Sequence, residues 1–276
     1  MVACIGLVIV FRTSDNLAAA YGIAVVLTMV ITTLLFFFAA RRLWGWSTPT
    51  TSLLCAVFLA AESAFLGANL IKIQHGGWFP LAVGIGGLVL MSTWQRGRER
   101  LRQRMTNNLL SIGDFLQSVT AELPPRVKGT AVFLAGNPDG TPVALLHNLK
   151  HNKMLHERVI LLTLRTEEIP YVEDEQRVTV TDLGKSFYRV IGRHGFMEEP
   201  NAPEVLGLCK PFGLNFREME TTYFLSRETV IPSDRRGLAG WRKRLFALMA
   251  RNSQPANAFF RLPPNRVVEL GMQVEL

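Results

Sequence analysis

Three histidines have the only spacing in this sequence that resembles a metal site: His147, His151 and His156. The first two are four positions apart in a segment, residues 143–151, whose pattern predicts a helix, so both imidazoles would lie on one face. A zinc protease has the sequence H-E-x-x-H, whereas this segment reads H-N-L-K-H and lacks the glutamate that would act as the base. We therefore expect these side chains to cap the helix and to form hydrogen bonds at the surface, with metal binding as the alternative.

Other patterns of catalytic residues are missing from the sequence. It contains no G-x-G-x-x-G, no G-x-x-x-x-G-K-[ST] and no G-x-S-x-G, the patterns typical of nucleotide-binding proteins and hydrolases. Cys4, Cys55 and Cys209 are far apart and form no C-x-x-C pair, so we expect neither a disulfide framework nor a structural zinc site. The sequence therefore predicts a protein that is not an enzyme and has no catalytic residue, metal or cofactor.

Glu62 lies inside an otherwise apolar stretch, residues 53–71. A carboxylate at membrane depth costs free energy and by default indicates a functional role. Two interpretations are open: Glu62 takes part in proton transfer, or it forms a packing or hydrogen-bond contact with a neighbouring helix.

The charged residues are concentrated in the second part of the chain. Of the 276 residues, 19% are charged, and residues 1–94 contain only four basic and two acidic residues. A soluble domain has about 25% charged residues. This distribution excludes a wholly soluble enzyme and a wholly disordered chain. It predicts a transmembrane region, residues 1–94, followed by a polar domain, residues 95–276, that is long enough to have its own core.

Three stretches of the first region are predicted to span a membrane. Residues 17–40 contain no charge and, as a helix, exceed the ~30 Å hydrocarbon core. Residues 53–71 and 76–94 are the second and third spans, and Trp78 and Trp94 suit the two membrane interfaces. The apolar segment 1–11 is too short to span, so we interpret it as the end of a further span and expect the chain to begin inside a larger protein.

Basic residues predict the orientation of these spans. Arg41 and Arg42 follow the first span, and a run of five arginines at 96–104 follows the third. Because positively charged loops stay in the cytoplasm, both clusters and residues 95–276 are expected there. Residues 95–106 would be a basic juxtamembrane linker that contacts anionic lipid rather than nucleic acid. Asp15 is expected to cap the outer start of the first span.

The polar domain is predicted to be a small α/β domain. Its expected strands are residues 130–136, 158–165, 177–182, 186–191 and 222–225, and its expected helices are residues 143–151, 203–209 and 238–251. The four residues 137–140, N-P-D-G, predict a turn. The order of the strands is not predicted by these patterns.

Several segments together resemble the Kup-type potassium uptake permeases of bacteria, the Kup/HAK/KT family. The segments are N-L-A-A-A-Y-G-I-A-V at 16–25, G-G-W-F-P-L at 76–81, H-N-L-K-H-N-K at 147–153, L-H-E-R-V-I-L-L-T-L at 155–164, T-T-Y-F-L-S-R-E-T at 221–229 and P-P-N-R-V-V-E-L-G at 263–271. The resemblance covers the whole chain but only the C-terminal half of the family's members.

The resemblance implies a transporter of the amino acid–polyamine–organocation type, with twelve spans and a cytoplasmic tail in the bacterial inner membrane. The chain would then contain the end of span nine, spans ten to twelve and the tail. Potassium uptake coupled to proton entry is implied, with the ion site mainly on broken helices that this chain lacks. The chain alone is therefore expected to be inactive. Its expected partners are potassium, protons, the lipid bilayer and the missing N-terminal spans, and a homodimer is left open; nucleic acid is not expected.

Tyr21 is the candidate ion ligand that remains, and Thr28, two turns along the same face, is a second. The alternative for Tyr21 is a position at the outer membrane interface. For Glu62 the resemblance favours the packing or hydrogen-bond role over proton coupling, because spans eleven and twelve lie outside the family's transport core.

A different class of function is also open: a membrane-anchored regulatory domain that binds a nucleotide second messenger or a partner protein. The basic residues that would meet phosphates are Arg235, Arg236, Arg242, Lys243 and Arg244. A basic surface facing the membrane is the other interpretation of the same residues.

Overall fold

The computed structural model describes residues 1–106, 110–121, 124–231 and 238–275. It divides into two compact units, Met1–Ser92 and Thr93–Leu276. This division lies two residues from the boundary that the charge distribution predicts.

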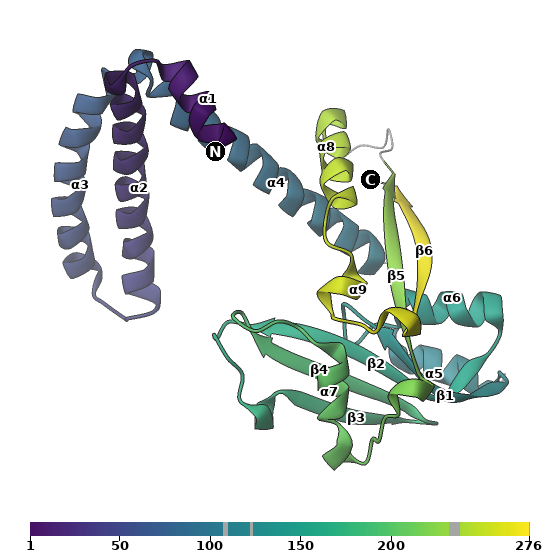
Figure 1. The fold of residues 1–276 in the computed structure, drawn as a ribbon. Helices are drawn as coiled ribbons and strands as arrows, with labels where there is room; N and C mark the ends of the chain where they lie inside the picture. The colour runs from purple at the N-terminus through teal and green to yellow at the C-terminus, as the bar shows by residue number, and fades with distance from the viewer. Residues whose placement is uncertain (107–109, 122–123, 232–237, 276) are drawn as a thin grey trace. The chain divides into compact units, whose positions relative to one another are not determined.

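The first unit is helical. It contains α1 (Val2–Phe11), α2 (Ser14–Arg42), α3 (Thr48–Leu70) and the start of α4 (Trp78–Thr106). Of the described helices, α2 and α3 are long and apolar enough to span a membrane, and they lie side by side in Figure 1. The first two predicted spans are thus helical. The third falls within α4, and its crossing of the membrane stays a prediction.

Local side-chain contacts decide where the two long apolar helices, α2 and α3, begin. The hydroxyl of Thr13 accepts a hydrogen bond from the backbone N–H of Asn16 and caps α2. The prediction that Asp15 is the cap is wrong: Asp15 lies in the first turn, where its charge suits the positive end of the helix dipole. Ser47 caps α3 in the same way as Thr13 caps α2.

A tight turn, which includes the short 3₁₀ helix Ile73–His75, follows α3. Gly76 in this turn has a φ of 138°, a backbone conformation that residues with a side chain rarely adopt. A Cβ at this position would also overlap the carbonyl of Asn16. A Cβ at Gly77 would overlap Ile23 of α2. The paired glycines therefore let this turn pack directly against the start of α2.

The second unit is an α/β domain with a six-stranded sheet. The strands are β1 (Arg126–Leu134), β2 (Leu155–Glu167), β3 (Val178–Gly184), β4 (Phe187–Gly195), β5 (Thr221–Ile231) and β6 (Val267–Glu275). Their order is β3-β4-β2-β1-β5-β6, and only β3 is antiparallel to its neighbour. From β1 the chain adds strands first on one side and then, from β5, on the other.

Helices cover both faces of this sheet, as expected for parallel strands with apolar residues on both sides. The helices α5 (Ile112–Ala121) and α6 (Val143–Asn152) pack with Phe133 and Leu161 on one face. The helix α7 (Ala202–Gly207) packs with Val132 and Leu162 on the other. Two further helices, α8 (Gly240–Arg251) and α9 (Ala256–Phe259), lie in the connection from β5 to β6.

The elements predicted from sequence are present in this unit. The five predicted strands correspond to β1 to β5, although β5 extends well beyond residues 222–225, and the three predicted helices correspond to α6, α7 and α8. The predicted turn at residues 137–140 is also observed. The helix α5 and the strand β6 were not predicted. Residues 95–106, predicted as a linker, continue α4 as a helix.

Candidate functional site

The buried carboxylate of the first unit bridges the two long apolar helices, α2 and α3. Glu62 on α3 is 6% exposed, and its Oε1 accepts a hydrogen bond of 2.7 Å from the hydroxyl of Thr33 on α2. The second oxygen, Oε2, is buried and has no hydrogen-bond partner among the described residues. This geometry fits the predicted contact with a neighbouring helix. Proton coupling by Glu62 stays a prediction.

The two candidate ion ligands lie on the opposite side of α2. The face of α2 that is buried in this unit contains Ile23, Val26 and Thr33. At about 100° per residue, Tyr21 and Thr28 are on the other face, and the side chain of Tyr21 is 73% exposed. The hydroxyl of Thr28 donates to the carbonyl of Ala24 at 2.8 Å, so its lone pairs stay available to a cation. The structure thus puts Tyr21 and Thr28 on one face, away from Glu62.

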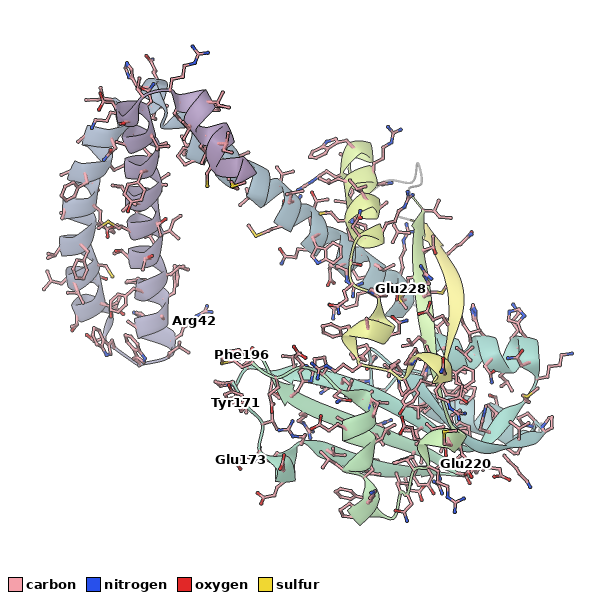
Figure 2. All side chains as sticks on the ribbon, viewed as in Figure 1. Arg42, Tyr171, Glu173, Phe196, Glu220 and Glu228 are labelled. Atoms are coloured by element: carbon pink, nitrogen blue, oxygen red, sulfur yellow. The ribbon has the colours of Figure 1, made fainter. Side chains whose placement is uncertain are left out.

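A cluster of aromatic residues that was not predicted lies beside Arg41 and Arg42. The ring of Phe36 contacts Trp44 at 5.8 Å and Trp46 at 6.0 Å, between centroids, where α2 ends and the loop to α3 begins. Figure 2 labels Arg42 at this end of the hairpin. Tryptophans beside arginines are typical of a membrane interface, and the W-G-W sequence could have indicated this.

The three histidines do not form a metal site. His147 and His151 lie on one face of α6, with ring centroids 5.9 Å apart, as predicted. His156 is on β2 and packs against Phe224 instead; its Nδ1 is buried without a hydrogen-bond partner in the described structure, and burial lowers the pKa of this imidazole. No group of three metal-ligating side chains occurs among the described residues.

The segment around these histidines has a structural role. Asn148 is buried on α6, and its amide donates to the carbonyl of Met154 at 3.0 Å. Asn152 donates to the side-chain oxygen of Asn148 at 2.9 Å. Lys153, at a φ of 54°, ends the helix. These contacts connect α6 to β2.

A groove of about 1790 Å³ lies at the carboxyl ends of the parallel strands in the second unit. Its walls are residues 94–105 of α4, the loop 135–142 that follows β1, the ends of β2 and the second half of β5. In open parallel sheets, ligands bind outside the carboxyl ends of the strands where the strand order reverses. Here this reversal lies between β1 and β5, so the groove is where a ligand of such a domain is expected.

Basic side chains predominate in the groove. It is lined by Arg96, Arg98, Arg100, Arg102, Arg165 and Arg242, against Glu99 and Glu228. Burial raises the pKa of Glu228, which Figure 2 labels on β5, and the charge of Arg98 acts in the opposite direction. Arg242 is the one of the five predicted phosphate-contacting residues that lines the groove; Lys243 and Arg244 are on α8, and Arg235 and Arg236 lie outside the described residues.

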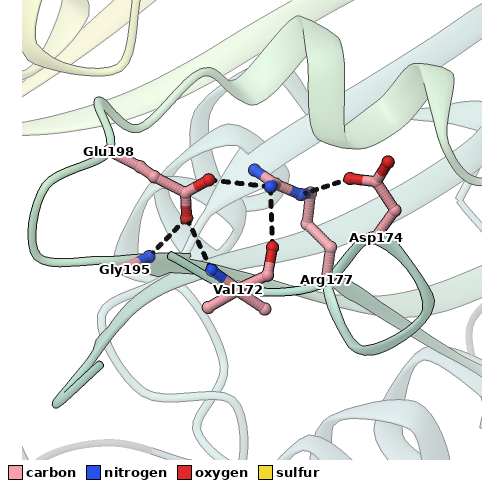
Figure 3. A network of polar contacts seen from close by, with 5 residues as sticks. All are labelled: Val172, Asp174, Arg177, Gly195 and Glu198. Atoms are coloured by element: carbon pink, nitrogen blue, oxygen red, sulfur yellow. Dashed lines mark hydrogen bonds and ion pairs between the residues drawn. The ribbon is translucent and has the colours of Figure 1, made fainter. Parts of the chain in front are cut away.

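A second polar network lies where β4 ends, as Figure 3 shows. The carboxylate of Glu198 accepts hydrogen bonds from the backbone N–H groups of Gly195 at 2.6 Å and Val172 at 3.1 Å, and from Arg177 at 2.7 Å. These bonds lower the pKa of Glu198 to about 2, the backbone donors contributing most. Arg177 also pairs with Asp174 at 3.1 Å and donates to the carbonyl of Val172 at 2.8 Å. Because Gly195, Val172 and Arg177 supply the hydrogen-bond donors of Glu198, this carboxylate joins two loops and has a structural role.

Comparison with known proteins agrees with the two units. The family model for the K+ potassium transporter integral membrane domain matches residues 1–99, and the model for the K+ potassium transporter C-terminal domain matches residues 128–276. The chain belongs to the Kup-type potassium transporter family. The resemblance read from its sequence segments is thereby confirmed.

Relatives from several bacteria match this family member over its length. A probable potassium transport system protein Kup 1 of Paramagnetospirillum magneticum is 52% identical over 279 residues, which include all of this chain and 43% of the relative. Probable Kup proteins of Myxococcus xanthus and Bdellovibrio bacteriovorus are 51% and 46% identical, with 42% of each relative covered. The chain thus spans less than half the length of these relatives. As a member of a transporter family, it is not an enzyme.

Proposed function

We propose that this chain contributes the C-terminal membrane helices and the C-terminal domain of a transporter that takes up potassium together with protons. The observation that carries the proposal is that both family models match in order along one chain, which is about half identical to relatives named as potassium transport proteins. The apolar helices α2 and α3 support a position in the membrane.

The proposed architecture is that of the amino acid–polyamine–organocation transporters, in the bacterial inner membrane. Arg41 and Arg42 end α2, and the arginines at 96–104 lie in the second half of α4. With α3 and the start of α4 as the two intervening spans, both clusters are on the cytoplasmic side. The α/β domain is then cytoplasmic.

In this proposal the ion pathway needs more helices than this chain provides. A dehydrated cation requires several oxygen ligands, and transporters supply them between two repeats that move relative to each other. Tyr21 and Thr28 offer two hydroxyl oxygens on the face of α2 that α3 leaves open. The other ligands would come from the membrane segment that the longer relatives have in addition, so the chain alone does not transport.

The test is growth at limiting potassium of a bacterium that lacks its own uptake systems. We expect no rescue by this chain alone, with its presence in the membrane verified, and rescue when it is joined to the additional membrane segment of the Paramagnetospirillum relative. Rescue by the chain alone would mean that copies of it assemble a pathway, and our position for the ion site would be wrong. Failure of the joined protein, if it is correctly inserted, would contradict the transport function itself.

The arginine-lined groove favours a second candidate function, binding of an anionic regulator by the C-terminal domain. Phosphates suit several arginines in one groove because guanidinium groups bind them through two parallel hydrogen bonds. A nucleotide second messenger such as a cyclic dinucleotide combines phosphates with flat bases, and Trp94 and Phe260 also line the groove.

This second function is tested by calorimetric titration of the full chain in detergent with cyclic di-adenylate and, separately, with cyclic di-guanylate. We expect saturable binding of one of them, weakened at least tenfold by Arg98→Ala with Arg165→Ala, and unchanged by Arg217→Ala, an exposed arginine outside the groove. Equal binding by both variants, or none by the unmodified chain, would exclude the regulator from this groove.

A further inference from the structure

The outer face of α8 alternates apolar and cationic side chains. Its buried face consists of Lys243, Phe246 and Ala247. On the opposite side, at intervals of one helical turn, are four exposed residues: Trp241, Arg244, Leu248 and Arg251. Trp241 and Leu248 are each 58% exposed. A shallow hollow lies on this face, lined by Leu248 and both arginines together with Leu245 and Ala247.

Contacts with the second half of α4 hold α8 in place. The ring of Phe246 contacts Trp94 with centroids 5.5 Å apart. Gly97, one turn later, lies so close to the same ring that a Cβ there would overlap it. The Nε of Arg242 donates to the hydroxyl of Thr93 at 2.9 Å. Helix α8 is thus fixed to the residues that directly follow the apolar part of α4.

These contacts put α8 at the depth of lipid headgroups. The predicted third span, residues 76–94, ends within α4 at Trp94, the predicted interfacial residue before the run of arginines. Since a helix rises about 1.5 Å per residue, Thr93, Trp94 and Gly97 are within one turn of the end of that stretch. With the start of α4 in the bilayer, helix α8, which packs on these three residues, lies at the membrane surface.

We propose that the outer face of α8 binds anionic phospholipid headgroups at the cytoplasmic leaflet. Charge complementarity favours this partner, because Arg244 and Arg251 flank the hollow and anionic lipids are concentrated in that leaflet. Trp241 and Leu248 supply the apolar contacts with which an amphipathic helix enters the interface. The inference rests on the membrane position of α4 and is independent of which ion the protein transports.

The experiment measures the surroundings of position 248 in proteoliposomes. The full chain carries Leu248→Cys in a Cys4→Ser background, where the remaining cysteines, Cys55 and Cys209, are buried. It is labelled with an environment-sensitive NBD dye and reconstituted in vesicles of phosphatidylcholine alone, or of equal parts phosphatidylcholine and phosphatidylglycerol. We expect the emission to move to shorter wavelength in the phosphatidylglycerol vesicles and to be quenched by lipids that carry a nitroxide close to the headgroup.

Charge-reversed variants make the test specific. Arg244→Glu with Arg251→Glu should abolish the dependence on phosphatidylglycerol; both side chains are exposed, so the Phe246 contact is retained. Arg217→Glu with Arg261→Glu changes the net charge equally at exposed positions outside α8 and should leave the emission shift intact. A label at Met219, which is 76% exposed on another element, should report water in both vesicles.

Two results would overturn the proposal. Emission at position 248 that reports water in both kinds of vesicle would mean that α8 does not meet lipid. Emission that is equally shifted in both, and unaffected by reversing Arg244 and Arg251, would mean that protein covers this face, for example a second copy of the chain.

Discussion

Thr33 on α2 donates a hydrogen bond of 2.7 Å to Glu62 on α3, and among the described residues it is the one hydrogen bond that joins a side chain of α2 to a side chain of α3. Thr33 also presents its backbone carbonyl to the thiol of Cys55 on α3, at 3.8 Å. Polar contacts of this kind hold membrane helices together, because lipid provides no competing donor or acceptor. These contacts fit a structural role of Glu62 in the helix pair, and proton coupling by Glu62 stays a prediction.

The first prediction concerns the strength of this contact. A double-mutant cycle of Thr33→Val and Glu62→Leu should give a coupling of about 0.6 kcal/mol, and at most about 1.7 kcal/mol. Glu62→Gln should keep most of the stability, because its amide oxygen still accepts the hydrogen bond. The measurement is reversible unfolding of the chain in detergent. Thr28→Val, whose hydroxyl bonds only within α2, should show no coupling to position 62.

The substitution Glu62→Gln also distinguishes the two possible roles of Glu62, the structural contact and proton coupling. In the protein completed with the additional membrane segment, Glu62→Gln should leave the pH dependence of potassium uptake nearly unchanged. The structural role of Glu62 requires only the hydrogen bond with Thr33, and Gln keeps this bond although it cannot carry a proton. The readout is rubidium or potassium uptake between about pH 5.5 and 8, where proton-coupled uptake responds to the proton gradient. Loss of the pH dependence would instead assign proton coupling to Glu62.

Tyr21→Phe tests the candidate ion ligand. Removing one oxygen ligand from a cation site should raise the potassium concentration for half-maximal uptake roughly tenfold, since about 1.4 kcal/mol corresponds to that factor. Thr28→Val should have a smaller effect in the same direction. Thr51→Val on α3 is the control: the Thr51 hydroxyl bonds to the carbonyl of Ser47, away from the face of α2 that contains Tyr21 and Thr28, and this variant should keep the unmodified affinity. Uptake at unmodified affinity in Tyr21→Phe would remove Tyr21 from the site.

Gly97 gives a prediction whose sign opposes helix propensity. In a solvent-exposed helix Gly→Ala stabilises by about 1 kcal/mol. At Gly97 the new methyl group would overlap the ring of Phe246, so Gly97→Ala should destabilise the contact between α4 and α8 by about 1–3 kcal/mol. Hydrogen exchange of the full chain should then be faster in α8.

Two control variants accompany Gly97→Ala. Gly113→Ala on α5, where a Cβ meets nothing closer than 3.8 Å, should not raise exchange anywhere. Adding Phe246→Leu to Gly97→Ala should restore part of the protection in α8. Slower exchange in α8 with Gly97→Ala alone would contradict the packing described here.

Strong local patterns made the helices and most strands predictable. The charge-free residues of α2 and the apolar run in β2 are each specified by consecutive side chains, and the structure contains both elements. The strand β6 was missed because Gly271 interrupts a short segment of mixed polarity, which becomes a strand only by pairing with β5. Pairing of β1 with the distant β5 likewise depends on long-range contacts that no local pattern contains.

The candidate sites were predictable only in part. Glu62 stood out because a carboxylate in an apolar span is unusual, but its partner Thr33 is 29 positions away and no spacing indicates it. The groove was not predicted, since its arginines come from α4, β2 and α8, which only the fold brings together. The helical spacing of His147 and His151 was predicted correctly, whereas the destination of His156 depended on the register of β2.

The final prediction concerns the acid sensitivity of the α/β domain. The pKa of Glu198 is lowered from 4.5 to about 2 by hydrogen bonds from Gly195, Val172 and Arg177. As pH falls from 4.5 towards 2, the unfolded chain takes up the proton before the folded one does. The stabilisation by Glu198 is therefore complete above pH 4.5 and is lost as pH approaches 2.

Glu198→Gln should lower the free energy of unfolding by about 1–3 kcal/mol at pH 7, because charge-assisted hydrogen bonds to three donors are weakened. The difference from the unmodified protein should shrink as pH falls from 4.5 towards 2; it is measured by calorimetric unfolding of the full chain in detergent. Comparison at each pH cancels the contributions of His156 and His194, whose pKa values burial lowers in both proteins. Glu173→Gln is the matched control, since Glu173 lies exposed in the same loop and its side chain makes no capping hydrogen bond. A destabilisation by Glu198→Gln that stays constant down to pH 2 would show that packing, rather than the carboxylate's charge, holds these loops together.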